Sequence, residues 1–120
     1  MRKKEVLRGK RDFNRVYSKG KSVRDRYLVL IYLKNGLPYT RTAFLASKKV
    51  GNSVQRNRAK RLMKESYRVL SEDIKEGYDL VMIARTTING KKCDQIRGSL
   101  KKSLEKAHVL GKHREAKEKR

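Results

Sequence analysis

Apolar side chains recur at helical spacing in three stretches of the chain. Phe13, Val16 and Tyr17 lie at i, i+3 and i+4, and Gly20 follows as a stop signal, so this stretch is predicted to form a short helix. Near the C-terminal end, Asp94 is a suitable N-cap for a stretch with one apolar stripe. The expected helices are residues 9–19, 53–70 and 94–108.

Strand-like stretches rich in Val, Ile, Leu and Tyr alternate with these helices. We expect strands at residues 22–33, 39–47 and 78–85. The segment Asn35-Gly36-Leu37-Pro38 predicts a turn, after which residues 39–47 form the return strand. The resulting order predicts an α+β fold, with a single small sheet packed with helices. The strand–helix–strand connection through residues 39–85 is right-handed by default.

Residues 53–70 separate into two faces when they are placed at about 100° per residue. One face, over roughly 140°, holds Arg56, Asn57, Lys60, Arg61, Lys64 and Arg68, with Arg58 at its boundary. The opposite face holds Ala59, Leu62, Met63, Ser66, Val69 and Leu70, and we expect it to pack on the sheet. Cations at i, i+3 and i+4 repel one another. A face that mixed acidic and basic side chains would serve solubility better. Phosphate binding is therefore favoured over a face that is merely solvated.

The residue types on the cationic face suit nucleic acid. Arginine presents a planar fork that takes phosphate oxygens bidentately, and Asn57 adds donors and an acceptor for a base edge or a sugar hydroxyl. Ahead of the helix, Lys48, Lys49 and Asn52 form a basic loop that runs into a helix N-terminus, where free backbone N–H groups favour an anion. Gly51 either supplies unusual backbone angles there or is an ordinary loop glycine.

Charge and composition narrow the classes of protein. The chain has 120 residues and a formal net charge of +22, which fits one small domain that binds a polyanion. The longest apolar run, residues 27–33, is far shorter than the roughly 18 residues that a membrane helix needs. No secretory signal is visible. With one cysteine, Cys93, an internal disulfide is excluded, which fits a cytoplasmic location.

The run KKVGNSVQRNRAKR at residues 48–61 resembles the signature of the bacterial ribonuclease P protein component. The resemblance extends over residues 7–110 and includes Asp12-Phe13, Tyr17, Gly20 and the strand end Ile83-Ala84-Arg85. It implies a fold similar to the second domain of ribosomal protein S5, with a left-handed strand–helix–strand connection in place of the default hand. Residues 111–120 are expected to be a disordered basic tail of this single RNA-binding domain.

The resemblance also implies a function. Proteins of this family are subunits of a ribonucleoprotein that cuts precursor transfer RNA at the mature 5′ end. The RNA subunit is the catalyst and uses magnesium ions. The protein binds the catalytic RNA and the single-stranded 5′ leader of the precursor, and no obligate protein partner or membrane is implied.

Candidate binding residues follow from the two lines of reasoning together. The predicted RNA-binding residues are Lys48, Lys49, Asn52, Arg56, Asn57, Arg58, Lys60, Arg61, Lys64 and Arg68. The leader groove that the resemblance implies contains Phe13, Tyr17, Ile31 and Tyr32 in this chain. Core packing is an equally weighted alternative for Phe13 and Tyr17. Ile31 stands where some relatives carry an aromatic residue, and Tyr27 or Tyr32 compensates if it lies on the same face.

Catalysis by the protein itself is not expected from the sequence. A cofactor-free nuclease commonly uses histidine as acid or base, and His108 and His113 both lie near the C-terminus. A metal-dependent nuclease needs clustered carboxylates, whereas Glu72, Asp73, Glu76 and Asp79 surround a loop and the start of a strand. We predict no catalytic residue and no protein metal site. The alternatives are a ribosomal or other structural RNA-binding protein, a DNA-binding domain and an independent nuclease.

Overall fold

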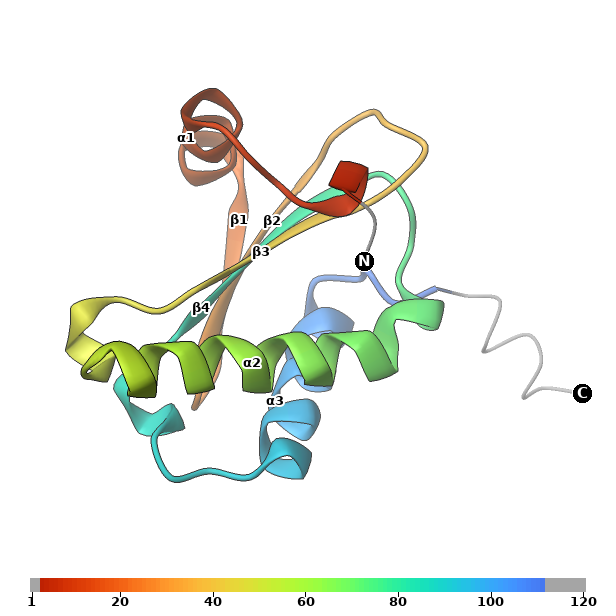
Figure 1. Ribbon diagram of the computed structural model, residues 1–120. Helices are drawn as coiled ribbons and strands as arrows, with labels where there is room; N and C mark the ends of the chain where they lie inside the picture. The colour runs from red at the N-terminus through yellow and green to blue at the C-terminus, as the bar shows by residue number, and fades with distance from the viewer. Residues whose placement is uncertain (1–2, 112–120) are drawn as a thin grey trace, which may run out of the picture.

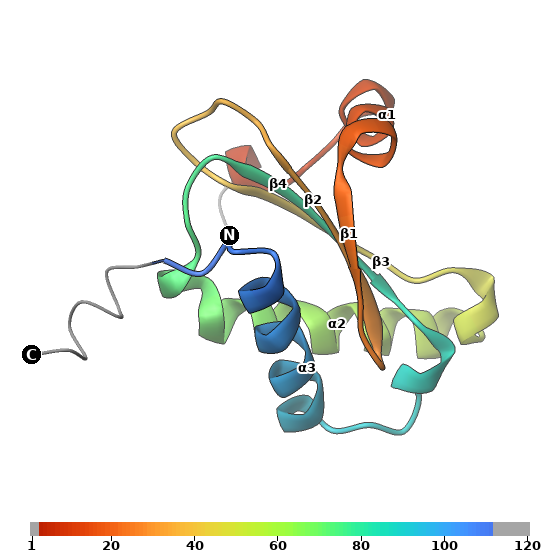
Figure 2. The ribbon, with the colours of Figure 1, turned by 180° about the vertical axis from the view of Figure 1, so that it is seen from behind.

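Helices cover both faces of a central sheet. The computed structural model of the chain describes residues 3–111. Helix α1 (Lys10–Lys19) lies on one face of the sheet, and α2 (Ser53–Leu70) and α3 (Cys93–Lys106) lie together on the other (Figure 1). The view from behind shows the same three layers (Figure 2). Short 3₁₀ helices at Lys3–Glu5, Lys48–Val50, Ser71–Asp73 and Thr86–Ile88 join these elements.

The sheet has four strands and mixed direction. Its strands are β1 (Lys21–Arg24), β2 (Leu28–Lys34), β3 (Arg41–Leu45) and β4 (Tyr78–Ala84), in the order β1-β2-β4-β3. The β1–β2 and β2–β4 pairs are antiparallel, and the β3–β4 pair is parallel. The predicted α+β class, with one small sheet packed with helices, is confirmed. The hand of the β3–α2–β4 connection stays a prediction.

Two of the predicted strands pair differently from expectation. The stretch predicted as one strand over 22–33 is a hairpin of β1 and β2, with a bend at residues 25–27 where the Asp25 N–H donates to the Leu28 carbonyl at 2.9 Å. The stretch 39–47 does not return alongside β2, because β4 lies between β2 and β3. Strand β4 is buried except at Tyr78 and Ile83, which are half-buried, as is typical of a central strand that is covered on both faces.

The main core lies between the sheet and the α2–α3 pair. Leu28, Leu30, Leu80 and Met82 point from the sheet into this core, where they meet buried residues of both helices, such as Met63. A smaller cluster of Leu7, Val16, Ala43 and Val81 lies on the α1 face, with Phe13, Ile31, Leu33, Leu45 and Ile83 packed partly buried against it. Because one short helix cannot cover a whole sheet face, much of this second face stays accessible.

Helix α3 begins one residue earlier than the expected cap. Its first residue is Cys93, and the Lys92 N–H donates to the Gln95 Oε1 atom at 2.9 Å. Asp94, predicted as N-cap, instead lies within the first turn of the helix. An acid in the first turn still opposes the positive end of the helix dipole. Asp94 therefore still favours a helix start at this point, although the helix begins one residue before it.

Candidate nucleic-acid interface

The start of α2 is fixed by a reciprocal cap. The Asn52 Oδ1 atom accepts from the Gln55 N–H at 2.9 Å, and the Gln55 Oε1 atom accepts from the Asn52 N–H at 2.9 Å. This arrangement satisfies two donors that a helix start otherwise leaves open. Asn52, predicted to contact RNA, therefore uses its side-chain oxygen for the helix, which leaves its amide NH₂ as the group able to meet RNA.

Gly51 carries the unusual backbone angles that were one of its two predicted roles. Its φ is +145°, and a Cβ placed there would lie 1.9 Å from the Gln55 Oε1 atom of the cap. Gly51→Ala is expected to destabilise the fold by about 1–3 kcal/mol through strain and loss of the cap. Gly98→Ala is the matched control, because Gly98 lies inside α3 with open space around its Cβ position. That control is expected to stabilise by about 0.5–1 kcal/mol in the same urea titration; equal effects at both positions would contradict the cap argument.

The buried stripe of α2 is rotated from the predicted one. Ala59, Met63, Ser66, Tyr67 and Leu70 are buried. Val69, predicted to face the sheet, is 56% exposed. Tyr67, which the sequence did not assign to that face, is 6% exposed. Its ring meets the Phe44 ring edge-on, with the two ring centroids 5.8 Å apart. The stripe turns because this bulky aromatic side chain takes the place beside β3, and Val69 is left outside.

The cationic face of α2 stays accessible. Asn57, Arg61, Lys64 and Arg68 are exposed, and Arg56 and Lys60 are half-buried. Lys48 and Lys49 are exposed on the 3₁₀ helix that precedes α2. Arg68 forms an exposed ion pair with Glu65 at 2.7 Å, and such a pair contributes little to stability. We use the name cationic face for Arg56, Asn57, Lys60, Arg61, Lys64 and Arg68.

Arg58 differs from its neighbours because it is held by the protein. Its Nη2 atom donates to the Lys91 carbonyl at 2.8 Å, which ties α2 to the segment before α3. Nearby, the Asn89 Nδ2 atom donates to the Val50 carbonyl at 2.7 Å. These two bonds join the loop after β4 to the start of α2. Arg58 therefore has a structural partner in addition to any phosphate that it meets.

A second accessible surface lies between α1 and the sheet. The Phe13 and Tyr17 rings stack with their centroids 6.1 Å apart, and Tyr17 is 46% exposed. Ile31 of β2 lies half-buried against the same cluster as Phe13. We keep the name α1 groove for Phe13, Tyr17 and Ile31, three residues that were predicted to line the leader groove. Phe13 is half-buried and packs against the cluster on the α1 face, which fits the core-packing alternative. Tyr17 is exposed, which fits a role in the groove.

Tyr32 does not join the α1 groove. Neighbouring residues on a strand point to opposite faces, and Tyr32 packs against the main core on the α2–α3 side. Tyr27 also belongs to that core, where it is 9% exposed. Neither tyrosine compensates for Ile31 on the α1 face. The prediction that Tyr32 lines the groove is therefore wrong.

A buried carboxylate that the sequence did not single out holds α1 in place. Asp79 is fully buried on β4. Arg41 donates to it from Nε at 2.9 Å and from Nη2 at 2.8 Å, Arg15 of α1 donates at 2.8 Å and Asn35 at 2.9 Å. The Arg41 Nη1 atom also reaches Asp12 of α1 at 3.1 Å. Hydrogen bonding to Asp79 raises the pKa of Arg41 above its usual range. An acid inside an otherwise apolar strand was the signal for this network.

The remaining candidate chemistry is sparse within residues 3–111. No group of three or more His, Cys, Asp or Glu residues in this part of the chain could hold a metal ion. His108 is exposed, Cys93 is half-buried beside Ser66, and His113 and the expected tail lie outside the described residues. None of the described helices combines the length and apolar character that a bilayer crossing needs.

A cationic helix face on one side of a small sheet and a stacked, partly exposed aromatic pair on the other define a nucleic-acid-binding protein of α+β class. The ribonuclease P family profile matches residues 1–108. The ribonuclease P protein component of Clostridium botulinum (strain Loch Maree) is 47% identical over 108 residues, which span 89% of this chain and 97% of that protein. That of Caldanaerobacter subterraneus is 45% identical over 100 residues, with 83% of each chain covered.

Solved structures agree with the sequence comparison. A Staphylococcus aureus RNase P protein mutant, described as defective in mRNA degradation activity, aligns with a TM-score of 0.83 at 34% identity, covering 90% of this chain and 92% of that one. The RNase P protein from Thermotoga maritima aligns with a TM-score of 0.77 at 31% identity, covering 85% of this chain and 96% of that one. The chain belongs to the family of ribonuclease P protein components.

Proposed function

We propose that the cationic face of α2 binds the phosphate backbone of the catalytic RNA subunit of ribonuclease P. The observation that carries this proposal is that the side chains of Lys60, Arg61 and Lys64 make no hydrogen bond or ion pair with another described residue, on a helix whose start is fixed by a reciprocal cap. Free cations on a fixed frame neutralise phosphates without first breaking internal bonds. Lys48 and Lys49 extend the same surface beyond the helix start.

The α1 groove is proposed to hold the 5′ leader of precursor transfer RNA. Single-stranded nucleic acid binds where bases can stack on aromatic side chains beside a basic surface. The stacked Phe13–Tyr17 pair supplies the aromatic surface. Arg24 of β1 is exposed and pairs with Val29 of β2, which places its side chain on the α1 face of the sheet. A leader strand lying in the groove would therefore meet a cation at its edge.

The chemical step is proposed to belong to the RNA subunit, with its magnesium ions held by RNA. The protein alone would then bring two anionic RNAs together and orient the leader, without cutting it. A cytoplasmic location and the absence of an obligate protein partner are parts of the same proposal. Family membership favours this role over that of a structural RNA-binding protein with no part in cleavage.

Reconstitution tests the proposed function directly. The full chain is mixed with its RNA subunit at low magnesium concentration, and cleavage of a precursor transfer RNA is followed. Cleavage at the mature 5′ end is expected with both subunits, and none with the protein alone. Cleavage by the protein alone would overturn the division of labour, and failure of the protein to stimulate the RNA would overturn the proposal as a whole.

Tyr17→Ala is expected to weaken binding of precursor transfer RNA while leaving mature transfer RNA nearly unaffected. Stacking of a base on an aromatic ring contributes about 1–3 kcal/mol, so the loss is roughly five- to 150-fold. The measurement is the affinity of the reconstituted enzyme for both RNAs. Asn14→Ala, an exposed position on the same helix, is the control and should change neither. An equal loss for both RNAs would show that Tyr17 supports the fold and not the leader.

A further inference from the structure

Helix α1, which carries the aromatic pair of the α1 groove, has few apolar contacts to hold it on the sheet. It has ten residues, and helices shorter than about 12 residues are marginal on their own. Val16 is its one buried residue, whereas Phe13 is half-buried and Tyr17 is 46% exposed. No side chain caps its first turn. The position of α1 therefore depends on its polar contacts.

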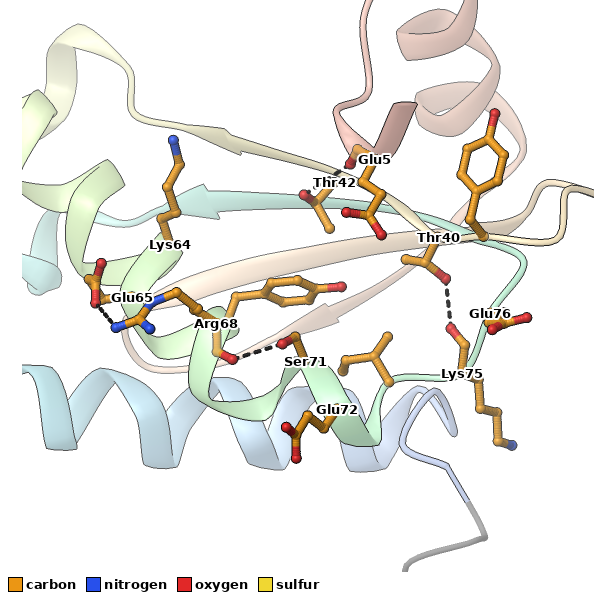
Figure 3. Close-up of a pocket in the computed structure, with 13 residues that line it drawn as sticks. Glu5, Thr40, Thr42, Lys64, Glu65, Arg68, Ser71, Glu72, Lys75 and Glu76 are labelled. Atoms are coloured by element: carbon orange, nitrogen blue, oxygen red, sulfur yellow. Dashed lines mark hydrogen bonds and ion pairs between the residues drawn. The ribbon is translucent and has the colours of Figure 1, made fainter. Parts of the chain in front are cut away.

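The segment before α1 is fastened to β3. The Leu7 N–H donates to the Thr42 carbonyl at 2.8 Å. Figure 3 shows Glu5 and Thr42 next to each other beside a pocket, where the Thr42 hydroxyl donates to the Glu5 carbonyl. Gly9, the residue just before α1, has a φ of +88°. Because glycine turns freely in this region, the anchor on β3 fixes where α1 begins but not how the helix is rotated about its axis.

Two ion pairs supply the remaining attachment of α1. The Arg15 Nη2 atom donates to the Asp79 Oδ2 atom at 2.8 Å. The Arg41 Nη1 atom donates to the Asp12 Oδ2 atom at 3.1 Å. Within residues 3–111, Asp12 and Arg15 are the only side chains of α1 that form a hydrogen bond or an ion pair with another element. Since Arg41 and Asp79 are paired in the register of β3 and β4, both ion pairs hold α1 at one place on the sheet.

Arg15 and Tyr17 lie on opposite flanks of α1. Residues two apart on an α-helix are separated by about 200° around its axis. Asp12 and Arg15 are three apart and share one flank, whereas Phe13 and Tyr17 are four apart and share the other. A leader base stacked on Tyr17 would therefore not touch Arg15. The ion pairs on one flank fix the rotation of the helix, and with it the direction in which the two stacked rings point.

We propose that Arg15 is a positioning residue for the 5′ leader: its ion pair with Asp79 fixes the rotation of α1 and so holds the Tyr17 ring at the groove. The inference rests on the proposed binding of the leader in the α1 groove and adds the contact that keeps this surface preformed. A ring held in place before binding loses less conformational entropy when a base stacks on it. Arg41 donates two hydrogen bonds of its own to Asp79, so loss of Arg15 leaves the buried carboxylate paired.

Arg15→Met tests the proposal while the buried carboxylate keeps its other partners. Methionine is as good a helix former as arginine, but it cannot pair with Asp79. The affinity of the reconstituted enzyme for precursor transfer RNA is expected to fall roughly two- to tenfold, with no change for mature transfer RNA. Hydrogen exchange should become faster in α1 and stay slow in β2 and β4. Unchanged affinity for the precursor, or an equal loss for both RNAs, would overturn the proposal.

Two further variants separate the ion pair from the charge. Arg11→Met is the matched control, because Arg11 is exposed on the same helix and pairs with no other described residue. It removes the same charge and should leave the preference for precursor over mature transfer RNA unchanged. Arg15→Lys keeps a cation that can reach Asp79 and should restore most of the lost affinity. A loss in Arg11→Met equal to that in Arg15→Met, or a lysine as weak as methionine, would contradict positioning by the ion pair.

Salt dependence separates positioning from direct contact with the leader. A cation that neutralises one phosphate of a single strand contributes about 0.7 to the slope of log affinity against log salt. Arg15→Met should give the same slope as Arg11→Met for the precursor, because its effect passes through Tyr17. A slope shallower by the contribution of one phosphate would make Arg15 a contact residue, which the proposal does not allow.

A double variant shows whether Arg15 acts through Tyr17. If it does, removing Arg15 costs little once Tyr17 is gone, so the variant with both Arg15→Met and Tyr17→Ala should lose less affinity than the product of the two single losses. Losses that multiply would overturn the positioning role. A selective loss in Tyr17→Ala with a neutral Arg15→Met would overturn this role alone. No selective loss in Tyr17→Ala would overturn leader binding in the α1 groove, and the positioning role with it.

Discussion

Replacing Lys60, Arg61 and Lys64 together by alanine is expected to give a protein that binds the RNA subunit far more weakly but unfolds at a higher urea concentration. Each phosphate that is no longer neutralised lowers the slope of log affinity against log salt by about 0.7–0.9, so three contacts lower it by roughly two to three. The free energy of unfolding rises because repulsion between cationic side chains three and four residues apart is removed. Alanine is also the best helix former. Loss of function is thus separated from loss of fold.

The control for this variant removes the same charge elsewhere. Lys101, Lys102 and Lys106 are exposed on α3, and their replacement by alanine also lowers the net charge by three. Binding should then weaken only slightly, with the salt slope unchanged, because long-range attraction is screened beyond about 10 Å at 0.1 M salt. An equal loss of slope in both variants would show that net charge, and not the face of α2, drives binding.

Asp79→Ala is expected to be the most destabilising single substitution on the α1 face. It leaves Arg41 and Arg15, whose side chains are 16% and 35% exposed, without their shared carboxylate. Breaking a buried ion pair by removing one partner costs about 3–5 kcal/mol. A small domain has only about 5–15 kcal/mol in total, so the urea midpoint should fall steeply.

The exposed pair on α2 serves as the comparison for Asp79. Glu65→Ala breaks the Arg68–Glu65 contact, whose side chains are 71% and 49% exposed, and should change stability by less than about 1 kcal/mol. If Asp79→Ala were equally mild, the network around Asp79 would not be what holds α1 on the sheet. Hydrogen exchange in α1 then provides a local check, because detachment of that helix would speed exchange there first.

The boundaries of α2 could be predicted because a local periodic pattern marks the whole helix. Residues 53–70 match Ser53–Leu70 in the structure, because the separation into a cationic and an apolar face persists over this whole stretch. The break between β1 and β2 was not predicted. The polar run Arg24-Asp25-Arg26 interrupts the strand formers of residues 22–33 at the position of the bend, and aspartate is a common turn residue. The bond from the Asp25 N–H to the Leu28 carbonyl then closes this bend in the structure.

The main limit on predicting the α1 groove was that the sequence did not show which face of the sheet each residue of β2 occupies. Strand β2 is apolar on both sides, so alternation could not tell whether Ile31 or Tyr32 lies under α1. The position of β4 between β2 and β3 decides this, because it fixes which residues share each core. The partners of Asp79 were similarly hidden, since they come from 38 to 64 residues away in sequence.

The interior position of β4 has a consequence for how the chain is made. During synthesis from the N-terminus, β3 has no strand to pair with until residue 84 has left the ribosome, because β4 is its neighbour within the sheet. A nascent chain that stops before Tyr78 can form the β1–β2 hairpin and the amphipathic α2, but it has no completed sheet against which α2 can pack. The cationic helix is therefore translated before the strand that completes its support, and folding waits on a long-range closure.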